Sequence, residues 1–243
     1  MCGRYVASRA AEDLAVAFDA EVQVRSGEQA PAPSWNVAPT DQVWGVVQRR
    51  ERDGAEAVRR LRPLRWGLVP SWAQSPASGA RLINARAETV HRKPAFRKAF
   101  TARRCLLPAD GYYEWETVPG GGRAKAVKKP YYLHPADGSL LAMAGLYEFW
   151  RDPEAPEGED GWIVSCTIIT TDATDSSGRV HPRMPLTIAA EHHADWLDPD
   201  HGDPDDLRAL LALPSGGDLD LRPVPPTVNS VRNDGPELIT EAP

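Results

Sequence analysis

The sequence has few cysteines, no long hydrophobic run and no dominant charge of one sign. Its three cysteines among 243 residues are odd in number and lack the close spacing of metal-binding pairs. This pattern excludes a disulfide framework or a zinc site as the basis of the fold and favours a reducing compartment. No stretch approaches the roughly 18 apolar residues of a membrane-spanning helix. Residues 1–20 do not resemble a signal peptide, so we expect a cytoplasmic protein.

The charge is unevenly distributed along the chain, although the net charge is only −6. Residues 1–133 hold 22 Lys and Arg against 13 Asp and Glu, whereas residues 134–243 hold 6 against 21. The acidic total argues against a protein that coats DNA without specificity, while the asymmetry predicts a basic face carried by the first half. Ordinary solvated surface charge explains the asymmetry equally well.

Strand signals outnumber helix signals. Strands are predicted at residues 42–48, 104–115, 130–134, 140–150 and 162–170, with an extended stretch at 81–89 and a last short strand near 227–231. Residues 58–66 are predicted to form an edge strand at best, because they contain Pro63. Helices are predicted at residues 9–20, capped by Ser8, and at 94–102, 191–197 and 205–211.

These elements do not alternate as βαβ units. We therefore expect an α+β fold, with a mixed, largely antiparallel, barrel-like β-sheet and flanking short helices. Residues 35–40 and 66–72 are predicted to be loops rich in aromatic residues and proline. No repeat, low-complexity tract or linker divides the chain, so residues 1–243 are expected to form a single domain.

The start of the chain, Met1-Cys2-Gly3-Arg4-Tyr5, has chemistry that no interior residue can copy. If Met1 is removed, Cys2 carries an α-amine with a pKa of about 7.7–8.0 beside a thiol with a pKa of about 8.5. This 1,2-aminothiol can trap an aldehyde, because the amine forms an imine and the thiolate then closes a five-membered thiazolidine. The second step is intramolecular and therefore fast. A frayed terminus without function is the alternative.

Three other residues could serve this reaction. Asn84 follows an apolar pair, Glu114 lies in an aromatic run, and His181 follows a serine-rich turn. A Glu among aromatic residues has a raised pKa and can donate a proton to departing water. Asn can hold the amine or a sugar oxygen, and His can move protons near neutral pH. A surface Glu, a turn Asn and a loop His remain equally valid interpretations at this point.

Six short motifs occur in one order along the chain. They are Met-Cys-Gly-Arg at 1–4, Asn-Val-Ala-Pro at 36–39, Trp-Gly-Leu-Val-Pro at 66–70, Ile-Asn-Ala-Arg at 83–86, Gly-Tyr-Tyr-Glu-Trp at 111–115, and His181 followed by Arg-Met-Pro at 183–185. Together they resemble the SOS-response-associated peptidase (SRAP) family from residue 2 to about residue 240. Members of that family crosslink to abasic sites in single-stranded DNA through an N-terminal Cys, and they remove whatever precedes that Cys.

The resemblance implies an enzyme and assigns roles to four residues. Cys2 would be the nucleophile, Asn84 would position the amine or the sugar, Glu114 would be the acid–base residue and His181 a second proton-transfer residue. Two segments depart from the family pattern: the loop at 175–177 that precedes His181, and the segment at 225–229. These departures leave the geometry around His181 open.

The resemblance also implies a partner, single-stranded DNA that contains abasic sites. The implied DNA-binding residues are Arg4, Asn36, Pro39, Trp72, Arg86 and Thr170. Arginine holds phosphates, while Trp and Pro present flat surfaces to bases. No metal, organic cofactor or membrane is implied. We expect a monomer that lies in the cytoplasm and at the nucleoid when it is bound to DNA.

Two other classes of function remain open from the sequence. Cys2 could be the nucleophile of a thiol protease that acts on other proteins, with Glu114 and His181 as its partners. The basic, Trp-containing loops have no evident use in such an enzyme. A non-catalytic single-stranded DNA-binding protein is the second alternative, and it leaves Cys2, Glu114 and His181 without a purpose.

Overall fold

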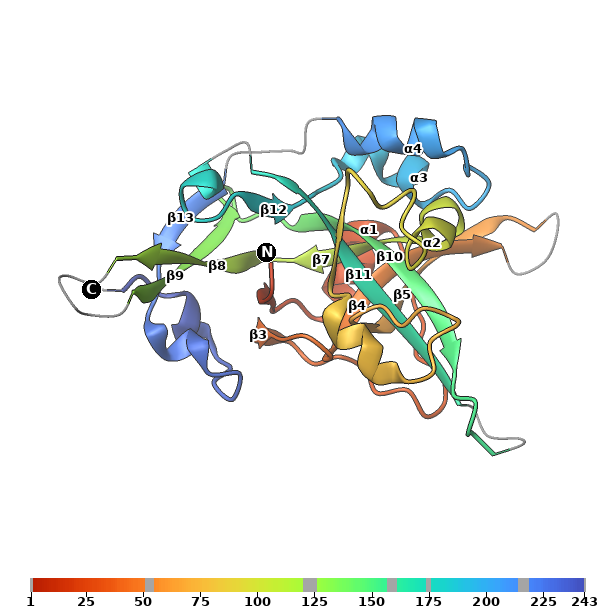
Figure 1. Ribbon diagram of the computed structural model, residues 1–243, viewed down its shortest axis with the longest axis horizontal. Coiled ribbons are helices and arrows are strands. Elements are labelled where there is room, and N and C mark those ends of the chain that lie inside the picture. Colours follow the sequence, from red (N-terminus) through yellow and green to blue (C-terminus); the bar gives the residue numbers. More distant parts are fainter. Residues whose placement is uncertain are drawn as a thin grey trace.

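A closed barrel of five strands forms the centre of the structure, a computed structural model that describes residues 2–50, 55–119, 126–156, 161–173, 176–213 and 219–242. Its strands are β4 (Gln42–Arg50), β5 (Ala57–Trp66), β7 (Arg104–Ala109), β10 (Leu141–Arg151) and β11 (Trp162–Asp172) (Figure 1). β5 and β11 close the barrel through a parallel pairing, whereas the other four pairings are antiparallel. Three short strands extend the barrel at its edges: β2 (Glu21–Val22), β6 (Asn84–Arg86) and β12 (Arg183–Pro185).

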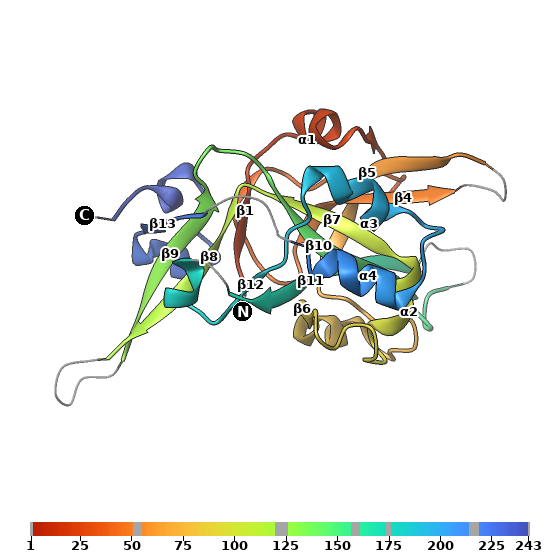
Figure 2. The ribbon, with the colours of Figure 1, turned by 90° about the horizontal axis from the view of Figure 1, so that it is seen from above.

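A second sheet of five antiparallel strands lies beside the barrel. Its order is β13 (Leu219–Pro223), β9 (Val127–Pro135), β8 (Gly111–Val118), β1 (Tyr5–Ala7) and β3 (Ser34–Val37). Figures 1 and 2 both place the N-terminal end of the chain between this sheet and the barrel. The first residues of the chain are therefore positioned by both sheets.

The strands alternate between two apolar clusters, as the pleat of a sheet requires. On β7, Leu106 packs outward, whereas Cys105 and Leu107 face the barrel interior. The outward cluster is covered by α1 (Ala11–Phe18), α2 (Arg97–Ala102), α3 (His193–Leu197) and α4 (Pro204–Leu211). A third, smaller cluster joins the second sheet to two 3₁₀ turns, Pro226–Asn229 and Pro236–Ile239.

The predicted α+β class with a mixed, largely antiparallel barrel and short helices is confirmed. Cys105 and Cys166 are fully buried free thiols. In the described part of the chain, no helix is long and apolar enough to cross a membrane.

Two local predictions near the N-terminus are wrong. Ser8 does not cap the first helix, which begins at Ala11 with Ala10 in the capping position. Instead, the backbone N–H and the hydroxyl of Ser8 donate to Asp110 at 2.6 and 2.9 Å. A carboxylate far away in sequence thus outcompetes the local cap. Residues 34–37 form strand β3 rather than the predicted loop, because they pair with β1.

The prediction of an edge strand at residues 58–66 is also wrong. β5 has ten residues and pairs with β4 on one side and with β2 and β11 on the other. Leu61 and Leu64 are fully buried in different clusters, one on each face of the strand. The free energy gained by burying these two leucines outweighs the loss of the one backbone hydrogen bond that Pro63 cannot donate.

Two strand boundaries differ from the prediction as well. Residues 104–115 form two strands in different sheets, β7 and β8, which are separated at Asp110. Asp110 is held there by hydrogen bonds from Ser8 and Arg9. The predicted strand near 227–231 is a 3₁₀ turn that starts at Pro226, and the last strand, β13, lies before it.

Candidate active site

Strand β1 of the second sheet holds the backbone that follows Cys2 beside the barrel. Tyr5 pairs with Val37 on β3 and with Tyr112 on β8, and its ring meets the edge of Trp66 at a centroid distance of 5.2 Å. Cys2 itself is fully buried. The side-chain amide of Asn84, on β6, donates to the carbonyl oxygen of Cys2 at 2.7 Å. Cys2 therefore lies where the barrel edge and the second sheet meet.

Glu114 points from β8 toward the same region. It lies on the face of the strand that also carries Tyr112, a member of the apolar cluster that contains Cys2. The side chain of Glu114 is buried, with 4% of its surface exposed. Burial raises the pKa of its carboxyl, and the charge of His181 acts in the opposite direction. A carboxyl group with a raised pKa can act as a proton donor near neutral pH.

The thiol of Cys2 is chemically suppressed in this environment. Burial raises its pKa well above the usual range, and the charge of Glu114 adds to the increase. The thiol lies 3.9 Å from the carbonyl oxygen of Arg4, which is within reach of a weak sulfur hydrogen bond. Nucleophilic attack by sulfur therefore requires a base that removes its proton.

His181 precedes β12 and has a defined orientation. Its Nδ1 accepts a hydrogen bond from the backbone N–H of Arg183 at 3.0 Å, so the neutral ring carries its proton on Nε2. The carbonyl oxygen of Arg183 lies 3.2 Å from the same Nδ1. The backbone of Arg183 therefore orients the ring of His181 through Nδ1.

Arg183 was not singled out from the sequence, yet it fixes the segment that carries His181. Its guanidinium pairs with Glu88 and Asp172, each at 2.6 Å, and donates to the carbonyl oxygen of Thr170 at 2.6 Å. The position of Arg183, two residues after His181 in the same motif, was the signal that could have identified it. The two ion pairs of Arg183 therefore connect β12 to β11, through Asp172, and to the turn after β6, through Glu88.

The structure thus brings together the four residues that the sequence predicted to be catalytic. A hydrogen bond links Asn84 to Cys2, and charge interactions link Glu114 to Cys2 and to His181. Oδ1 of Asn84 is buried and has no hydrogen-bond partner within the described ranges. An acceptor is therefore available beside Cys2 for an amine or hydroxyl of a substrate. Their catalytic roles stay predictions.

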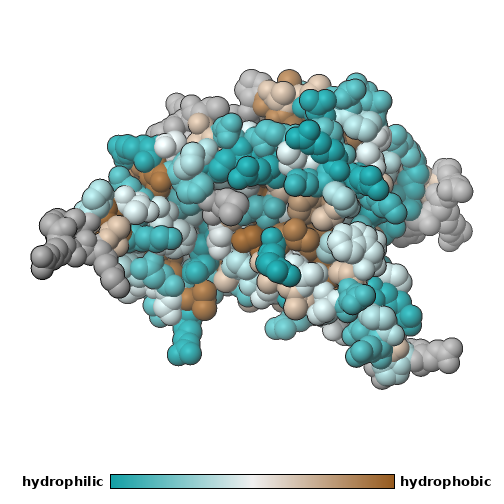
Figure 3. Space-filling model, viewed as in Figure 1, coloured by the Kyte–Doolittle hydropathy of each residue, from teal (hydrophilic) through white to brown (hydrophobic). Residues whose placement is uncertain are grey.

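Four of the six predicted DNA-binding residues reach the surface, and Arg4, described below, is one of them. Trp72 has 68% of its surface exposed, Arg86 is exposed and Pro39 is half-buried. Arg86 lies two residues after Asn84 on β6, so both side chains point to the same side of that strand. The face of the molecule seen in Figure 3 is mainly hydrophilic, with small hydrophobic areas near its centre.

Arg4 and Asn36 form a connected pair beneath that surface. Arg4 is half-buried and donates to Oδ1 of Asn36 at 2.7 Å and to the carbonyl oxygen of Val228 at 3.1 Å. Asn36 is 3% exposed, and its amide nitrogen donates to the carbonyl oxygens of Ser230 and Asn233 at 3.0 and 2.6 Å. Asn36 is thus placed to orient Arg4 rather than to contact a ligand itself.

Thr170 is 1% exposed on β11, opposite Arg86. Its hydroxyl lies 3.4 Å from the guanidinium of Arg183, and its carbonyl oxygen accepts the hydrogen bond described above. Thr170 is therefore placed to hold Arg183.

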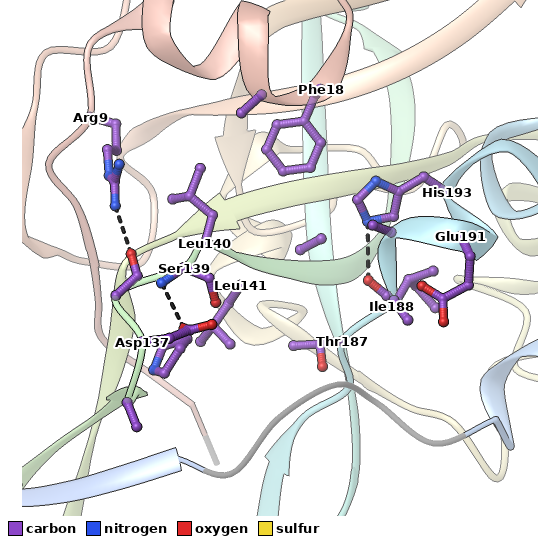
Figure 4. A pocket seen from close by; sticks show the side chains of 17 residues that line it. Arg9, Phe18, Asp137, Ser139, Leu140, Leu141, Thr187, Ile188, Glu191 and His193 are labelled. Carbon is purple, nitrogen blue, oxygen red and sulfur yellow. Dashed lines mark hydrogen bonds between the residues drawn. The ribbon is translucent and has the colours of Figure 1, made fainter.

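One cavity of about 770 Å³ lies elsewhere, between α1, the start of β10 and residues 187–193. Figure 4 shows Phe18 facing His193, whose rings stack at 5.4 Å, and Arg9 bonded to the loop before β10. None of the predicted site residues lines this cavity. Within the residues that the structure describes, no group of three or more His, Cys, Asp and Glu side chains could hold a metal ion.

Comparison with known proteins points to one family. The chain matches the family described as SOS response associated peptidase (SRAP) over residues 1–231. It is 37% identical over 239 residues to the abasic site processing protein YoqW of Bacillus subtilis. That alignment covers 98% of this chain and 99% of YoqW. It is 31% identical over 241 residues to the abasic site processing protein HMCES of Mus musculus. That alignment covers 86% of this chain and 65% of HMCES.

Solved structures agree on the fold. A crystal structure of a protein from Bacteroides thetaiotaomicron superposes with a TM-score of 0.79 at 24% identity, covering 99% of this chain and 100% of the other. A protein from Bordetella bronchiseptica superposes with a TM-score of 0.68 at 26% identity, covering 92% and 100% of the two chains. The barrel and its companion sheet therefore form an architecture that other proteins share.

Proposed function

The chain belongs to the SOS response associated peptidase (SRAP) family, and from this premise we propose that it processes abasic sites in DNA. The proposed reaction is covalent capture of the ring-opened sugar aldehyde in single-stranded DNA, through Cys2 after removal of Met1. The names of the relatives support the class of substrate. The observations that support the chemistry are the hydrogen bond from Asn84 to Cys2 and the charge interactions of Glu114 with Cys2 and with His181.

The proposed capture has two bond-forming steps. The α-amine of Cys2 adds to the aldehyde carbon, and the adduct loses one water to give an imine. The sulfur of Cys2 then adds to the same carbon, and the nitrogen takes up the proton that the thiol gives up. Aldehyde and aminothiol thus become thiazolidine and water, with no oxidant or cofactor required.

Each neighbouring residue has a proposed part in these steps. Glu114 gives a proton to the departing water and, once ionised, accepts the proton of the suppressed thiol. Asn84 holds Cys2 through its carbonyl oxygen and offers its free Oδ1 to the amine or to a sugar hydroxyl. His181 supplies a second proton, in capture and in reversal of the ring closure. Arg4, Trp72, Arg86 and Pro39 would hold the strand on either side of the lesion.

A denaturing gel tests this proposal. Mature protein is incubated with single-stranded DNA that carries one abasic site, and matched DNA without the lesion is the control. We expect an adduct that resists heat and denaturant only with the lesion. Absence of the adduct from protein whose N-terminal Cys2 has been verified by mass spectrometry would refute covalent capture and leave the protease or the non-catalytic binder.

We also propose that the same residues remove the residue before Cys2, in a hydrolysis that consumes one water. An aminopeptidase could remove Met1 as well, so the test uses a chain with four extra residues before Cys2. We expect mass spectrometry to find this extension removed from the parent chain and retained in the Glu114→Gln chain. Equal removal of the extension from both chains would show that Glu114 is not required for its removal. We further propose that one chain acts as a monomer and as a single domain, since all four residues come from one chain.

A further inference from the structure

Trp115 follows Glu114 on β8, and its side chain points to the opposite side of that strand. It shares this side with Tyr113, and the centroids of the two rings are 6.4 Å apart. Trp115 is half-buried, and the guanidinium of Arg4 lies over its ring, 5.9 Å from the centroid. A cation within about 6 Å of a Trp ring is attracted to its face. Trp115 therefore holds the first basic side chain after Cys2.

A hydrogen bond to the C-terminal part of the chain fixes the indole of Trp115. Its Nε1 donates to Oδ1 of Asn229 at 2.6 Å. Asn229 is the exposed last residue of the 3₁₀ turn Pro226–Asn229, and Val228 in the same turn is fully buried. The carbonyl oxygen of Val228 accepts a hydrogen bond from Nη1 of Arg4 at 3.1 Å. One turn thus fixes the guanidinium twice, directly through Val228 and indirectly through Asn229 and Trp115.

The guanidinium of Arg4 keeps donors for a ligand. Both of its hydrogen bonds come from Nη1, which donates to Asn36 and to Val228. Nη2 bonds to none of the described residues, and Nε is buried without a partner among them. Burial lowers the pKa of Arg4, and the charge of Asp41 opposes this change. The carboxylate of Asp41 accepts the backbone N–H of Ala38 at 2.8 Å. An anion at Nη2 would give this partly desolvated cation both an acceptor and an opposite charge.

We propose that Trp115 and Asn229 are positioning residues that hold the guanidinium of Arg4 against a phosphate next to the abasic sugar. This role rests on the proposed function. Arg4 follows Cys2 by two residues, so their Cα atoms lie at most about 7 Å apart. The two phosphates of a nucleotide are only a few ångströms from its sugar, so a sugar held at Cys2 brings one of them to Arg4. A guanidinium that is already fixed loses less side-chain entropy when the phosphate binds.

The test measures non-covalent binding, so that it does not depend on capture. The probe is a single-stranded oligonucleotide with one tetrahydrofuran residue, which has the phosphates of an abasic site but no aldehyde. Fluorescence anisotropy at several salt concentrations compares the parent with Trp115→Leu and with Trp162→Leu, a control that changes a half-exposed Trp at the start of β11. We expect Trp115→Leu to bind about two- to fivefold more weakly, with a salt slope flattened by up to about 0.7. The control should bind like the parent.

Double variants separate positioning from a structural role. Trp115→Leu should cause no further loss of affinity in an Arg4→Ala chain, because the ring then has no guanidinium to hold. Equal losses in the parent and in the Arg4→Ala chain would overturn the proposal.

Two milder variants test the bond to Asn229 and also serve if Trp115→Leu does not fold. Trp115→Phe keeps a ring beneath Arg4 but loses the donor, and Asn229→Ala loses the acceptor. Both should weaken binding by the same, smaller factor, and the double variant should be no weaker than either single variant. Parent-like affinity and salt slope in both single variants would overturn the part assigned to Asn229.

Neutral methylphosphonate linkages identify the phosphate. One is placed on either side of the tetrahydrofuran residue in turn, and we expect one of the two to weaken binding of the parent but not of Arg4→Ala. If neither linkage distinguishes the two proteins, Arg4 does not contact a flanking phosphate and the proposal is overturned. Capture of a true abasic site is followed separately on denaturing gels. A parent that binds the tetrahydrofuran strand as expected but forms no adduct would refute the capture chemistry and leave the positioning of Arg4 supported.

Discussion

The side-chain amide of Asn84 holds the carbonyl oxygen of Cys2 at 2.7 Å. This contact uses a backbone atom of Cys2, so it leaves both the thiol and the nitrogen of that residue available for chemistry. It is also independent of what precedes Cys2. The bond can therefore orient Cys2 both before and after Met1 is removed.

Replacing Asn84 by Ala should slow capture without abolishing it. The loss of one hydrogen bond to a reacting residue is worth about 0.5–1.5 kcal/mol, or roughly a 2- to 12-fold decrease in rate. Single-turnover gels at saturating abasic DNA measure the change. Thr101→Ala, on α2, is the control. An unaltered rate in Asn84→Ala would remove Asn84 from the reacting site.

Replacing Cys2 by Ser should abolish the stable adduct, because a hydroxyl cannot close the sulfur ring. The α-amine remains, so a hydride reductant should still trap an imine. Denaturing gels with and without reductant distinguish the two products. A heat-stable adduct of Cys2→Ser without reductant would contradict the thiazolidine. A tag retained before Cys2 should also prevent capture, and full activity with such a tag would show that the amine does not react.

Replacing Glu114 by Gln should lower the rate of capture by about 10²- to 10⁴-fold while DNA affinity is maintained. Gln keeps the size of Glu but cannot transfer a proton. Glu116→Gln is the matched control, because Glu116 lies two residues along β8 and bonds to the hydroxyl of Tyr131. Parent-like capture by Glu114→Gln between about pH 6 and 8 would exclude the acid–base role. Unfolding of the variant, seen by circular dichroism, would identify the carboxyl group as structural.

The pH dependence of capture should reflect the raised pKa of Glu114. If the protonated carboxyl gives the proton to water, the rate decreases as the pH rises through that pKa. Rates are measured at saturating DNA across the pH range for the parent and for Glu114→Gln. The descending limb should be present in the parent and absent from the variant. If the rate decreases with pH in the same way in the parent and in Glu114→Gln, a group other than Glu114 is responsible for the decrease.

Replacing His181 by Ala should affect reversal more than capture. Ring opening needs a proton on the sulfur or nitrogen that leaves, and a protonated His181 is the proposed donor. Pre-formed adduct is mixed with excess competing aldehyde, and release of the DNA is followed over time. We expect slower release from His181→Ala and from Arg183→Met, which loses the pairs with Glu88 and Asp172. Release at the parent rate in both would show that this segment has no part in reversal.

Replacing Arg86 by Ala should weaken binding to every single-stranded sequence alike. Each phosphate contact contributes about −0.7 to the slope of log K against log salt concentration, so one lost contact should flatten the slope by that amount. Fluorescence anisotropy at several salt concentrations measures it, with Arg208→Ala as the control. A loss confined to certain sequences would mean that Arg86 reads bases instead of phosphates.

The sequence predicted the fold class from local signals, whereas Asn84, Glu114 and His181 were assigned roles beside Cys2 through the resemblance to a family. Alternation and short apolar runs identify strands, and Cys2 and Glu114 are chemically unusual where they stand. It could not predict contacts made between distant segments. Ser8 binds Asp110 rather than its own helix, and Arg183 binds Glu88 across two strands. Pro63 lies in an interior strand because tertiary burial overrides its local preference.

The same limit applies to the DNA-binding residues. Arg4, Asn36 and Thr170 are residue types that hold nucleic acids at surfaces, and nothing in the sequence tells how deeply they lie. The structure buries Asn36 and Thr170 and uses their polar atoms internally. Trp72 and Arg86 remain at the surface, where the sequence expected them.

The contacts of Arg4 and Asn36 with residues 228–233 have a consequence for protein synthesis. The first residues of the chain are positioned by almost the last ones. During translation, a nascent chain on the ribosome exposes its N-terminus long before residue 233 exists. Contacts of such high sequence separation form late. If an aminopeptidase removes Met1 during synthesis, a ribosome-bound intermediate should therefore present an N-terminal Cys2 before the groups around it have assembled. Self-processing that depends on Glu114 would instead have to wait until residues 228–233 have left the ribosome.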